Sequence, residues 1–346
     1  MTMTSNKPTT AVEIVLPGRV DPDGLQLTHR SLAGPGAGQA LVRMEASGVS
    51  FAEQQMRRGK YYDQPPFPFV PGYDVVGTVT QVGDGVDTAL VGQRVAALTK
   101  VGGWSSHLLL EAADLVAVPA GLDAADAETF VVNGITAWQM LHRIAKVRSG
   151  QTILVHGANG GVGSTLVQLA RAGGIRVIGT ASTRHSATVE ALGASWIDYR
   201  GNVPGQVRAL AANGVDAVFD HIGGPGIADS FGLLAPGGTL VSYGTASTKD
   251  HDGNSRLPVL KLLARLLWWN MLPNKRNAHF YNLWAGKRNI TRFRRQIAED
   301  LGTVFGLAAD GTLRAQVAAR IPLTEATRAM ELAESGTVMG KVVLVP

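Results

Sequence analysis

QTILVHGANGGVG, residues 151–163, is the stretch that decides the fold. A short and mainly apolar run leads directly into Gly157, Gly160 and Gly163, which are spaced three residues apart. This spacing lets a strand end, lets the backbone turn sharply without Cβ atoms in the way, and lets a helix begin with its free N–H groups facing a pyrophosphate. The stretch therefore predicts a dinucleotide-binding turn.

A glycine triplet alone is a weak signal in a chain with 42 glycines, but the sequence around it repeats one pattern. Helical and strand-like segments alternate after the turn: STLVQLARAGG, IRVIGTAS, ATVEALGA, WIDY, VRALAANG, VDAVFD, GIADSFGLLAPGG and TLVSYG. The first of these is helical because Leu166, Leu169 and Ala170 fall on one face. Strands alternating with helices of this size predict an α/β fold with a doubly wound parallel sheet.

The end of the second predicted strand indicates which dinucleotide binds. NAD-binding sheets usually place an Asp or Glu about 20 residues after the glycine turn. Here Ala181 is followed by Ser182, Thr183 and Arg184. Hydroxyls and a guanidinium would bind a 2′-phosphate that a carboxylate would repel, so the sequence favours NADP(H) over NAD(H). The same residues also suit a helix N-cap and a solvated first turn.

Composition excludes several classes of protein. The chain of 346 residues is 45% hydrophobic and 17% charged, has a formal charge of +5, and contains no cysteine. It therefore offers no disulfide or thiolate site, and its basic excess is too dispersed for nucleic-acid binding. The opening MTMTSNKPTT lacks the apolar core of a signal peptide, and no apolar run reaches the length of a membrane span. We expect a cytoplasmic protein.

The sequence before the glycine turn has a different pattern of apolar and polar residues. Residues 11–120 contain short alternating runs separated by Gly- and Pro-rich turns, which outlines a partly closed, all-β barrel. The final stretch returns to strand, helix and strand, and we expect it to complete that barrel. The predicted domains are 1–128 with 310–346, and 129–309, the latter with an extended helical segment at about 250–276.

Taken together, these motifs resemble the medium-chain dehydrogenase/reductase superfamily, in its zinc-free quinone oxidoreductase branch. The resemblance runs from about Val12 to Pro346 through SGVSFAEQQMRRGKYY, VPGYDVVGTVTQVG, GQRVAAL, ITAW, HGANGGVG, IDYR, LVSYGT and GKVVLVP. It implies a GroES-like catalytic domain, a Rossmann domain that binds NADP(H), and a homodimer.

Zinc alcohol dehydrogenases of the same superfamily place Cys, His and Cys at positions where this chain has Ser50, Tyr73 and Val132. None of the three suits a tetrahedral zinc site, and no pair of the eight histidines shows metal-ligand spacing, so we expect no metal. His156 and His221 fall at strand ends, where we expect hydrogen-bonded structural histidines. Without a metal, hydrogen-bond donors must polarise a carbonyl oxygen.

The resemblance supplies the candidate site residues. Tyr61 matches a family tyrosine near the nicotinamide, Ser50 stands where many relatives carry Asn, and Tyr73 would line the same pocket; each is also explained as a packing or strand-end residue. Lys341 looks like a family feature, although an exposed lysine is the default interpretation. The predicted cofactor-binding residues are Thr136, Asn159, Gly160, Gly161, Val162, Gly163, Ser182, Arg184, Tyr199, Tyr243, Gly244, Thr245, Phe280, Tyr281 and Lys341.

The implied reaction is hydride transfer from NADPH to a quinone or to an α,β-unsaturated carbonyl, with the proton coming from water or Tyr61.

One apolar segment supports a second hypothesis about function. LPVLKLLARLLWWNML, residues 257–272, is apolar on nearly all sides and is similar to the corresponding region of vesicle amine transport protein 1-like members. It would pack on the Rossmann domain, form a dimer contact, roof a substrate pocket, or lie on a membrane. We favour a helix that packs against the protein as structural cover. The alternative function that this segment keeps open is an NADP-binding adaptor or lipid-associated protein with little or no turnover.

Overall fold

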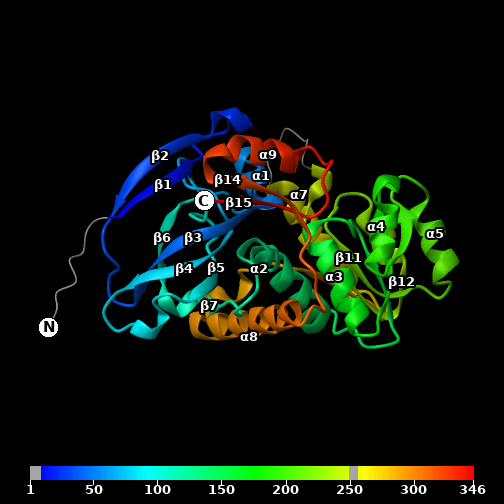
Figure 1. Ribbon diagram of the computed structural model, residues 1–346. Helices are drawn as coiled ribbons and strands as arrows, with labels where there is room; N and C mark the ends of the chain where they lie inside the picture. The colour runs from blue at the N-terminus through cyan, green and yellow to red at the C-terminus, as the bar shows by residue number, and fades with distance from the viewer. Residues whose placement is uncertain (1–8, 249–255) are drawn as a thin grey trace. The chain divides into compact units, whose positions relative to one another are not determined.

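The computed structural model describes residues 9–248 and 256–346 and divides into two compact units (Figure 1). The first unit runs from the start of the described chain to Val132 and from Asn289 to Pro346, and the second comprises Asn133–Arg288. The boundary expected between residues 309 and 310 thus lies between Arg288 and Asn289, before helix α8 (Ile290–Ala309) instead of after it. Helix α8 belongs to the first unit, where Arg294 binds Asp114 at 2.7 Å.

The first unit is built on β-strands, as the alternating runs predict. Its main sheet has the order β14-β15-β3-β4-β5-β7, with β6 also paired to β3, and β1 and β2 form a separate antiparallel pair. The chain's last strand pairs with both β14 and β3, which confirms that the C-terminal stretch completes this domain. The elements are β1 Thr9–Val15, β2 Gln26–Leu32, β3 Gln39–Val49, α1 Phe51–Arg57, β4 Asp74–Val82, β5 Arg94–Leu98, β6 His107–Glu111, β7 Val116–Ala117, β14 Val317–Pro322, α9 Ala326–Glu334 and β15 Lys341–Val345.

The core of the first unit lies under α9. Met330 on this helix packs with strand residues such as Met44 and Leu344, and Trp104 lies fully buried among them. The indole N–H of Trp104 donates to the carbonyl oxygen of Gly48 at 2.9 Å, so the ring is buried without an unsatisfied donor. Burial of this apolar surface holds the strands that present the site.

The second unit is a parallel, six-stranded sheet of order β10-β9-β8-β11-β12-β13, as expected for a Rossmann fold. The order reverses between β8 and β11, and ligands of such sheets bind beyond the carboxyl ends of the strands at this point. The strands are β8 Thr152–Val155, β9 Arg176–Ala181, β10 Ser195–Asp198, β11 Val215–Asp220, β12 Leu234–Ser242 and β13 Asn277–Phe280; the helices are α3 Gly161–Ala172, α4 Ser186–Ala191, α5 Val203–Leu210, α6 Ile227–Gly232 and α7 Arg256–Met271. Helix α2 (Ala124–Trp138) leads into this unit and continues as a π-helical turn, Gln139–Ile144.

One predicted helix is too long. The stretch GIADSFGLLAPGG was expected to be helical throughout, but α6 ends at Gly232 and β12 already begins at Leu234. Leu234 is buried and pairs with Val215, and the register then shifts before the next pair. Gly237, at φ +87°, lies in this irregularity. Burial of Leu234 in the sheet therefore overrides the helical pattern.

Helix α7 is the described part of the extended segment expected at 250–276, of which residues 249–255 lie outside the described residues. Leu262 and Leu266 are buried, and the ring of Trp269 stacks on Phe231 with centroids 4.3 Å apart. The helix thus covers the second unit with one face, as we favoured. Among the described residues, the structure contains no helix with both the length and the apolar character needed to cross a membrane.

Candidate functional site

The glycine turn joins β8 to α3 as the sequence predicts, and its packing requires glycine at two positions. Gly157 has φ +64°, and a Cβ there would lie 2.5 Å from a ring carbon of His221. A Cβ on Gly163 would lie 2.1 Å from the carbonyl oxygen of Gly157. Among the residues that the structure describes, no side chain caps α3 at Gly160, which leaves its first N–H groups to bind an anionic ligand.

The end of β9 presents hydroxyls and a cation, also as predicted. Ser182 is buried, whereas Thr183 and Arg184 are exposed. The hydroxyl of Thr183 donates to the carboxylate of Asp198 at 3.1 Å, which brings one acidic group from the neighbouring strand to this edge. The strand end that carries Arg184 thus also carries a carboxylate, held by the neighbouring Thr183.

Strand β10 adds two further groups at the same edge, because Asp198 pairs in register with Ala181 of β9. Tyr199 is 47% exposed, and the guanidinium of Arg200 lies 5.4 Å from the centre of its ring. Arg200 was missed as a site residue, although the motif IDYR contains it. The structure thus places two arginines and one exposed tyrosine at the ends of β9 and β10.

The predicted nicotinamide-side residues gather beyond the other strands of the sheet and on α2. Thr136 is buried on α2, and Tyr243, Gly244 and Thr245 follow β12 directly. Phe280 ends β13, and Tyr281 donates its hydroxyl to Gln139 at 3.0 Å. The second unit therefore brings the predicted cofactor residues that follow its strands to one edge of its sheet, while Thr136 lies on α2 and Lys341 lies in the first unit.

The two strand-end histidines behave differently. His156 hydrogen-bonds Ser230 at 3.0 Å, and Ser230 donates to Asp220 at 2.7 Å, so the prediction of a structural histidine is confirmed for His156. His221 follows β11, and its buried Nδ1 has no hydrogen-bond partner among the described residues. The ring of His221 does hydrogen-bond the backbone of His156, so for this histidine only Nδ1 departs from the prediction.

The first unit brings Tyr61 and Tyr73 together. Their hydroxyl oxygens are 2.9 Å apart, and their rings meet edge to face at 6.4 Å. Burial raises the pKa of Tyr61 far above that of a free tyrosine, and the neighbouring Tyr73 and Tyr62 add to the shift. Tyr61 therefore remains a neutral hydroxyl, suited to donating a hydrogen bond rather than to forming a phenolate.

Ser50 is joined to these tyrosines through Glu53. Ser50 begins α1 as the N-cap of a capping box: its backbone N–H and its hydroxyl both donate to the Glu53 carboxylate. The other carboxylate oxygen accepts the backbone N–H of Tyr73 at 2.7 Å. Burial raises the pKa of Glu53, while the Ser50 hydroxyl opposes that shift. In this structure, Ser50 serves to hold the buried carboxylate in place.

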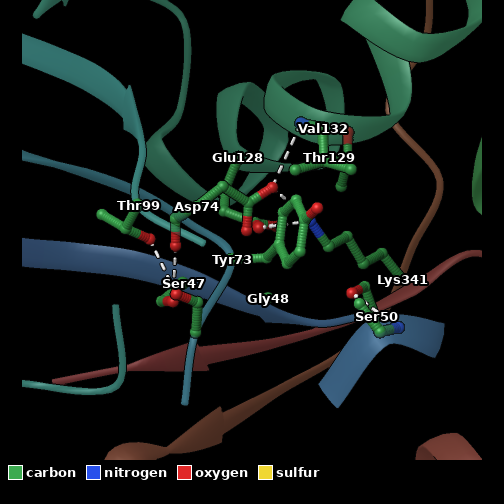
Figure 2. Close-up of polar contacts among 12 residues, drawn as sticks. Ser47, Gly48, Ser50, Tyr73, Asp74, Thr99, Glu128, Thr129, Val132 and Lys341 are labelled. Carbon is green, nitrogen blue, oxygen red and sulfur yellow. Dashed lines mark hydrogen bonds and ion pairs between the residues drawn. The ribbon is translucent and has the colours of Figure 1, made fainter. Parts of the chain in front are cut away.

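Lys341 is not an exposed lysine, contrary to the default interpretation. Its ammonium is enclosed in the first unit, 2.8 Å from Asp74 and 2.5 Å from Glu128 (Figure 2). Burial opposes the charge on Lys341, but the two carboxylates outweigh it and raise the pKa. The backbone N–H of Val132 also donates to Asp74 at 3.1 Å. Lys341 therefore joins β15, β4 and α2 within this unit.

Sequence reasoning missed Asp74 and Glu128 because their partner Lys341 is 267 and 213 residues away along the chain. The signal that was available is the acidic residue within GYD, directly after Tyr73. Within the described part of the chain, Oδ1 of Asp74 and Oε2 of Glu128 are buried without a hydrogen-bond partner. Among the described residues, no group of three or more His, Cys, Asp or Glu side chains is arranged to hold a metal ion.

Comparison with known proteins places the chain in a family. The model of the alcohol dehydrogenase GroES-like domain matches residues 36–120, and that of the zinc-binding dehydrogenase matches residues 192–344. The human synaptic vesicle membrane protein VAT-1 homolog is 31% identical, in a comparison that covers 96% of this chain and 86% of the relative.

Solved structures agree with this relationship. Escherichia coli quinone oxidoreductase complexed with NADPH has 26% identity and a TM-score of 0.84, over 98% of this chain and 100% of that one. A mycobacterial quinone oxidoreductase has 29% identity and a TM-score of 0.79, over 97% and 100% of the two chains. The chain therefore belongs to the medium-chain dehydrogenase/reductase superfamily, in its quinone oxidoreductase branch.

Proposed function

We propose that the protein is a zinc-independent, NADPH-dependent reductase that transfers hydride to a quinone or an α,β-unsaturated carbonyl compound. The observation that supports this most directly is the glycine turn at the switch point of the parallel sheet. A Cβ at Gly157 would clash with His221, and a Cβ at Gly163 would clash with the Gly157 carbonyl, so the two glycines allow the tight turn that pyrophosphate binding needs. The uncapped start of α3 offers N–H donors to the same group.

The proposed preference for NADPH rests on the residues that follow β9 and β10. Arg184 and Arg200 provide two guanidiniums near the ends of β9 and β10, and Thr183 adds a hydroxyl. The carboxylate of Asp198 is already bonded by Thr183 and by the backbone N–H of Arg200 at 3.0 Å. Its charge is thereby partly offset, and the arginines remain to bind a 2′-phosphate. Relatives support the assignment, since the E. coli structure is an NADPH complex.

When bound, NADPH supplies the hydride from its C4 position. The protein's part is to orient the acceptor and to stabilise the negative charge that develops on its oxygen. We assign Tyr61 as the hydrogen-bond donor to that oxygen. The hydroxyl of Tyr73, 2.9 Å from the hydroxyl of Tyr61, holds Tyr61 in place. The raised pKa of Tyr61 disfavours a phenolate, so a proton that Tyr61 passes to the substrate must be replaced; the proton that completes enone reduction comes from water, either directly or through Tyr61.

Zinc has no part in this proposal. Tyr73 and Val132 offer no ligand, and the Ser50 hydroxyl is engaged with Glu53. We assign Lys341 to the support of this unit rather than to the cofactor, because both of its carboxylate partners enclose it. By analogy with the family, we propose a cytoplasmic homodimer acting on a small hydrophobic electrophile.

The test is cofactor binding by fluorescence with Arg184→Glu. We expect NADPH affinity to fall at least about tenfold, since charge-assisted hydrogen bonds contribute about 1.5–3 kcal/mol, while NADH affinity hardly changes. Arg208→Glu on α5 is the matched control, because it makes the same charge change at another exposed site in the second unit. Equal loss of NADPH and NADH with Arg184→Glu would remove this arginine from the 2′-phosphate site.

One observation favours a second function, association with a lipid surface. The face of α7 opposite Leu262 and Leu266 is apolar and exposed; Trp268 is 60% exposed and Met271 is 78% exposed. Residues 256–288 contain basic side chains and no Asp or Glu. An apolar helix face in such surroundings suits the surface of an anionic bilayer.

Vesicle flotation tests this second function. Wild-type protein should float with anionic vesicles, and the double substitution Leu267→Ser with Trp268→Ser should abolish flotation, because both side chains lie on the exposed face. Leu210→Ser, which removes another exposed leucine of the second unit, should leave flotation unchanged. Absence of wild-type protein from the floated fraction would reject lipid association and leave the reductase proposal standing.

A further inference from the structure

His221 lies at the switch point of the parallel sheet, where the family motifs assign no side chain. It follows β11 directly, and its ring fills the space beside Gly157, so close that a Cβ on that glycine would lie 2.5 Å from Cε1. On its other side, its ring centre is 5.9 Å from that of Tyr243, after β12. The imidazole therefore lies between the glycine turn and the loop that follows β12.

The backbone holds His221 firmly at this place. Asp220 accepts the backbone N–H groups of Ile222 and Gly223 at 2.7 and 2.8 Å, which closes a tight turn around His221. The carbonyl oxygen of His221 accepts the N–H of Ala246 at 3.0 Å. These bonds set the backbone position of His221 at this edge.

The chemistry of the ring is that of a neutral donor and acceptor. Burial lowers the pKa of His221, and the opposing effects of Asp220 and of a hydrogen bond from the ring to the His156 backbone are smaller, so the imidazole is uncharged at neutral pH. A neutral imidazole offers one N–H and one lone pair. Its Nδ1 is buried and has no partner among the described residues. Such a nitrogen is costly unless a ligand, or a turn of the ring towards one, satisfies it.

We propose that His221 is a cofactor-binding residue whose imidazole hydrogen-bonds a hydroxyl of the nicotinamide riboside. This rests on the proposed function, and the strand order supports it. The arginines lie beyond β9 and β10, the glycine turn follows β8, and His221 follows β11, so the riboside is the next part of an extended dinucleotide. A hydroxyl can pair with either tautomer of the imidazole, whereas a phosphate oxygen can only accept.

The experiment measures binding of NADPH and of 2′,5′-ADP, which lacks the nicotinamide riboside. His221→Leu should weaken NADPH about 3- to 10-fold, the worth of one hydrogen bond, and should leave 2′,5′-ADP unchanged. His221→Asn keeps polar atoms near the place of Nδ1 and should restore most of the NADPH affinity. Thermal unfolding of each variant establishes that it is folded.

Unchanged NADPH affinity in a folded His221→Leu variant overturns the inference and leaves the proposed function intact. Equal weakening of NADPH and 2′,5′-ADP also overturns it, because His221 would then only support the glycine turn. Wild-type protein that does not bind NADPH rejects the proposed function and the inference with it. Should His221→Leu fail to fold, the imidazole nitrogen resonances of wild-type His221 decide: they should shift with NADPH and remain fixed with 2′,5′-ADP.

Discussion

Replacing Lys341 by Met should destabilise the protein strongly, although it leaves the chain's surface unchanged. The side chain of Lys341 is 3% exposed, and those of Asp74 and Glu128 are 1% and 0% exposed. Removing the ammonium leaves two carboxylates in the interior without their cation. Breaking a buried ion pair in this way costs about 3–5 kcal/mol. For a unit of this size, that corresponds to a fall in Tm of about 6–20 °C, measured by calorimetry.

Two variants make this prediction specific. Lys146→Met removes an exposed lysine and should leave Tm within about 2 °C of wild type, as expected for a surface substitution. Adding Glu128→Gln to Lys341→Met should recover part of the loss, because one of the two stranded carboxylates is then neutral. A Tm for Lys341→Met within about 2 °C of wild type would refute the argument that the buried cluster depends on this cation.

Three further predictions concern the site and its surroundings. Tyr61→Phe should lower kcat about 10- to 100-fold with little change in Tm, because it removes one donor to the developing oxyanion; an unchanged kcat would exclude that role. Gly157→Ala should destabilise by about 1–3 kcal/mol and weaken NADPH, whereas Gly85→Ala, at φ +77° with open space around it, should show only the smaller backbone cost. Burial and Asp74 raise the pKa of Glu128 well above 4.5, while Lys341 opposes the shift, so between the unfolded and the folded pKa the folded protein keeps a proton that the unfolded chain has lost. Stability should therefore fall as pH rises above that value, and urea midpoints between pH 5 and 9 should fall less steeply in Glu128→Gln; parallel profiles would contradict this.

The parts of the fold that sequence predicted are those set by local signals. The glycine turn, the strand before it and the helix after it follow from 13 consecutive residues, Gln151–Gly163, and the structure has them as expected. The parts that differ depend on distant partners. Leu234 forms a strand because Val215 pairs with it, and α8 lies in the first unit, where its Arg294 meets Asp114, 180 residues away.

The candidate site divides in the same way. Residues at strand ends were predictable from their position along the chain, since parallel strands bring their carboxyl ends to one edge. The cluster around Lys341 was not, because burial and pairing of its three side chains depend on how β15, β4 and α2 meet. His221 was noticed as a strand-end residue, but whether its nitrogens have partners is a property of the folded turn alone.

The most direct test of the central claim is NADPH consumption, followed at the absorbance of the reduced cofactor, with purified protein, a chelator, and a panel of quinones and enones. The account predicts turnover that persists in the chelator, prefers NADPH to NADH, and falls in Arg184→Glu. Turnover lost on chelation and restored by zinc would contradict a zinc-independent reductase. Tight NADPH binding without turnover on any acceptor would contradict the reductase assignment for this panel and favour the lipid-associated alternative.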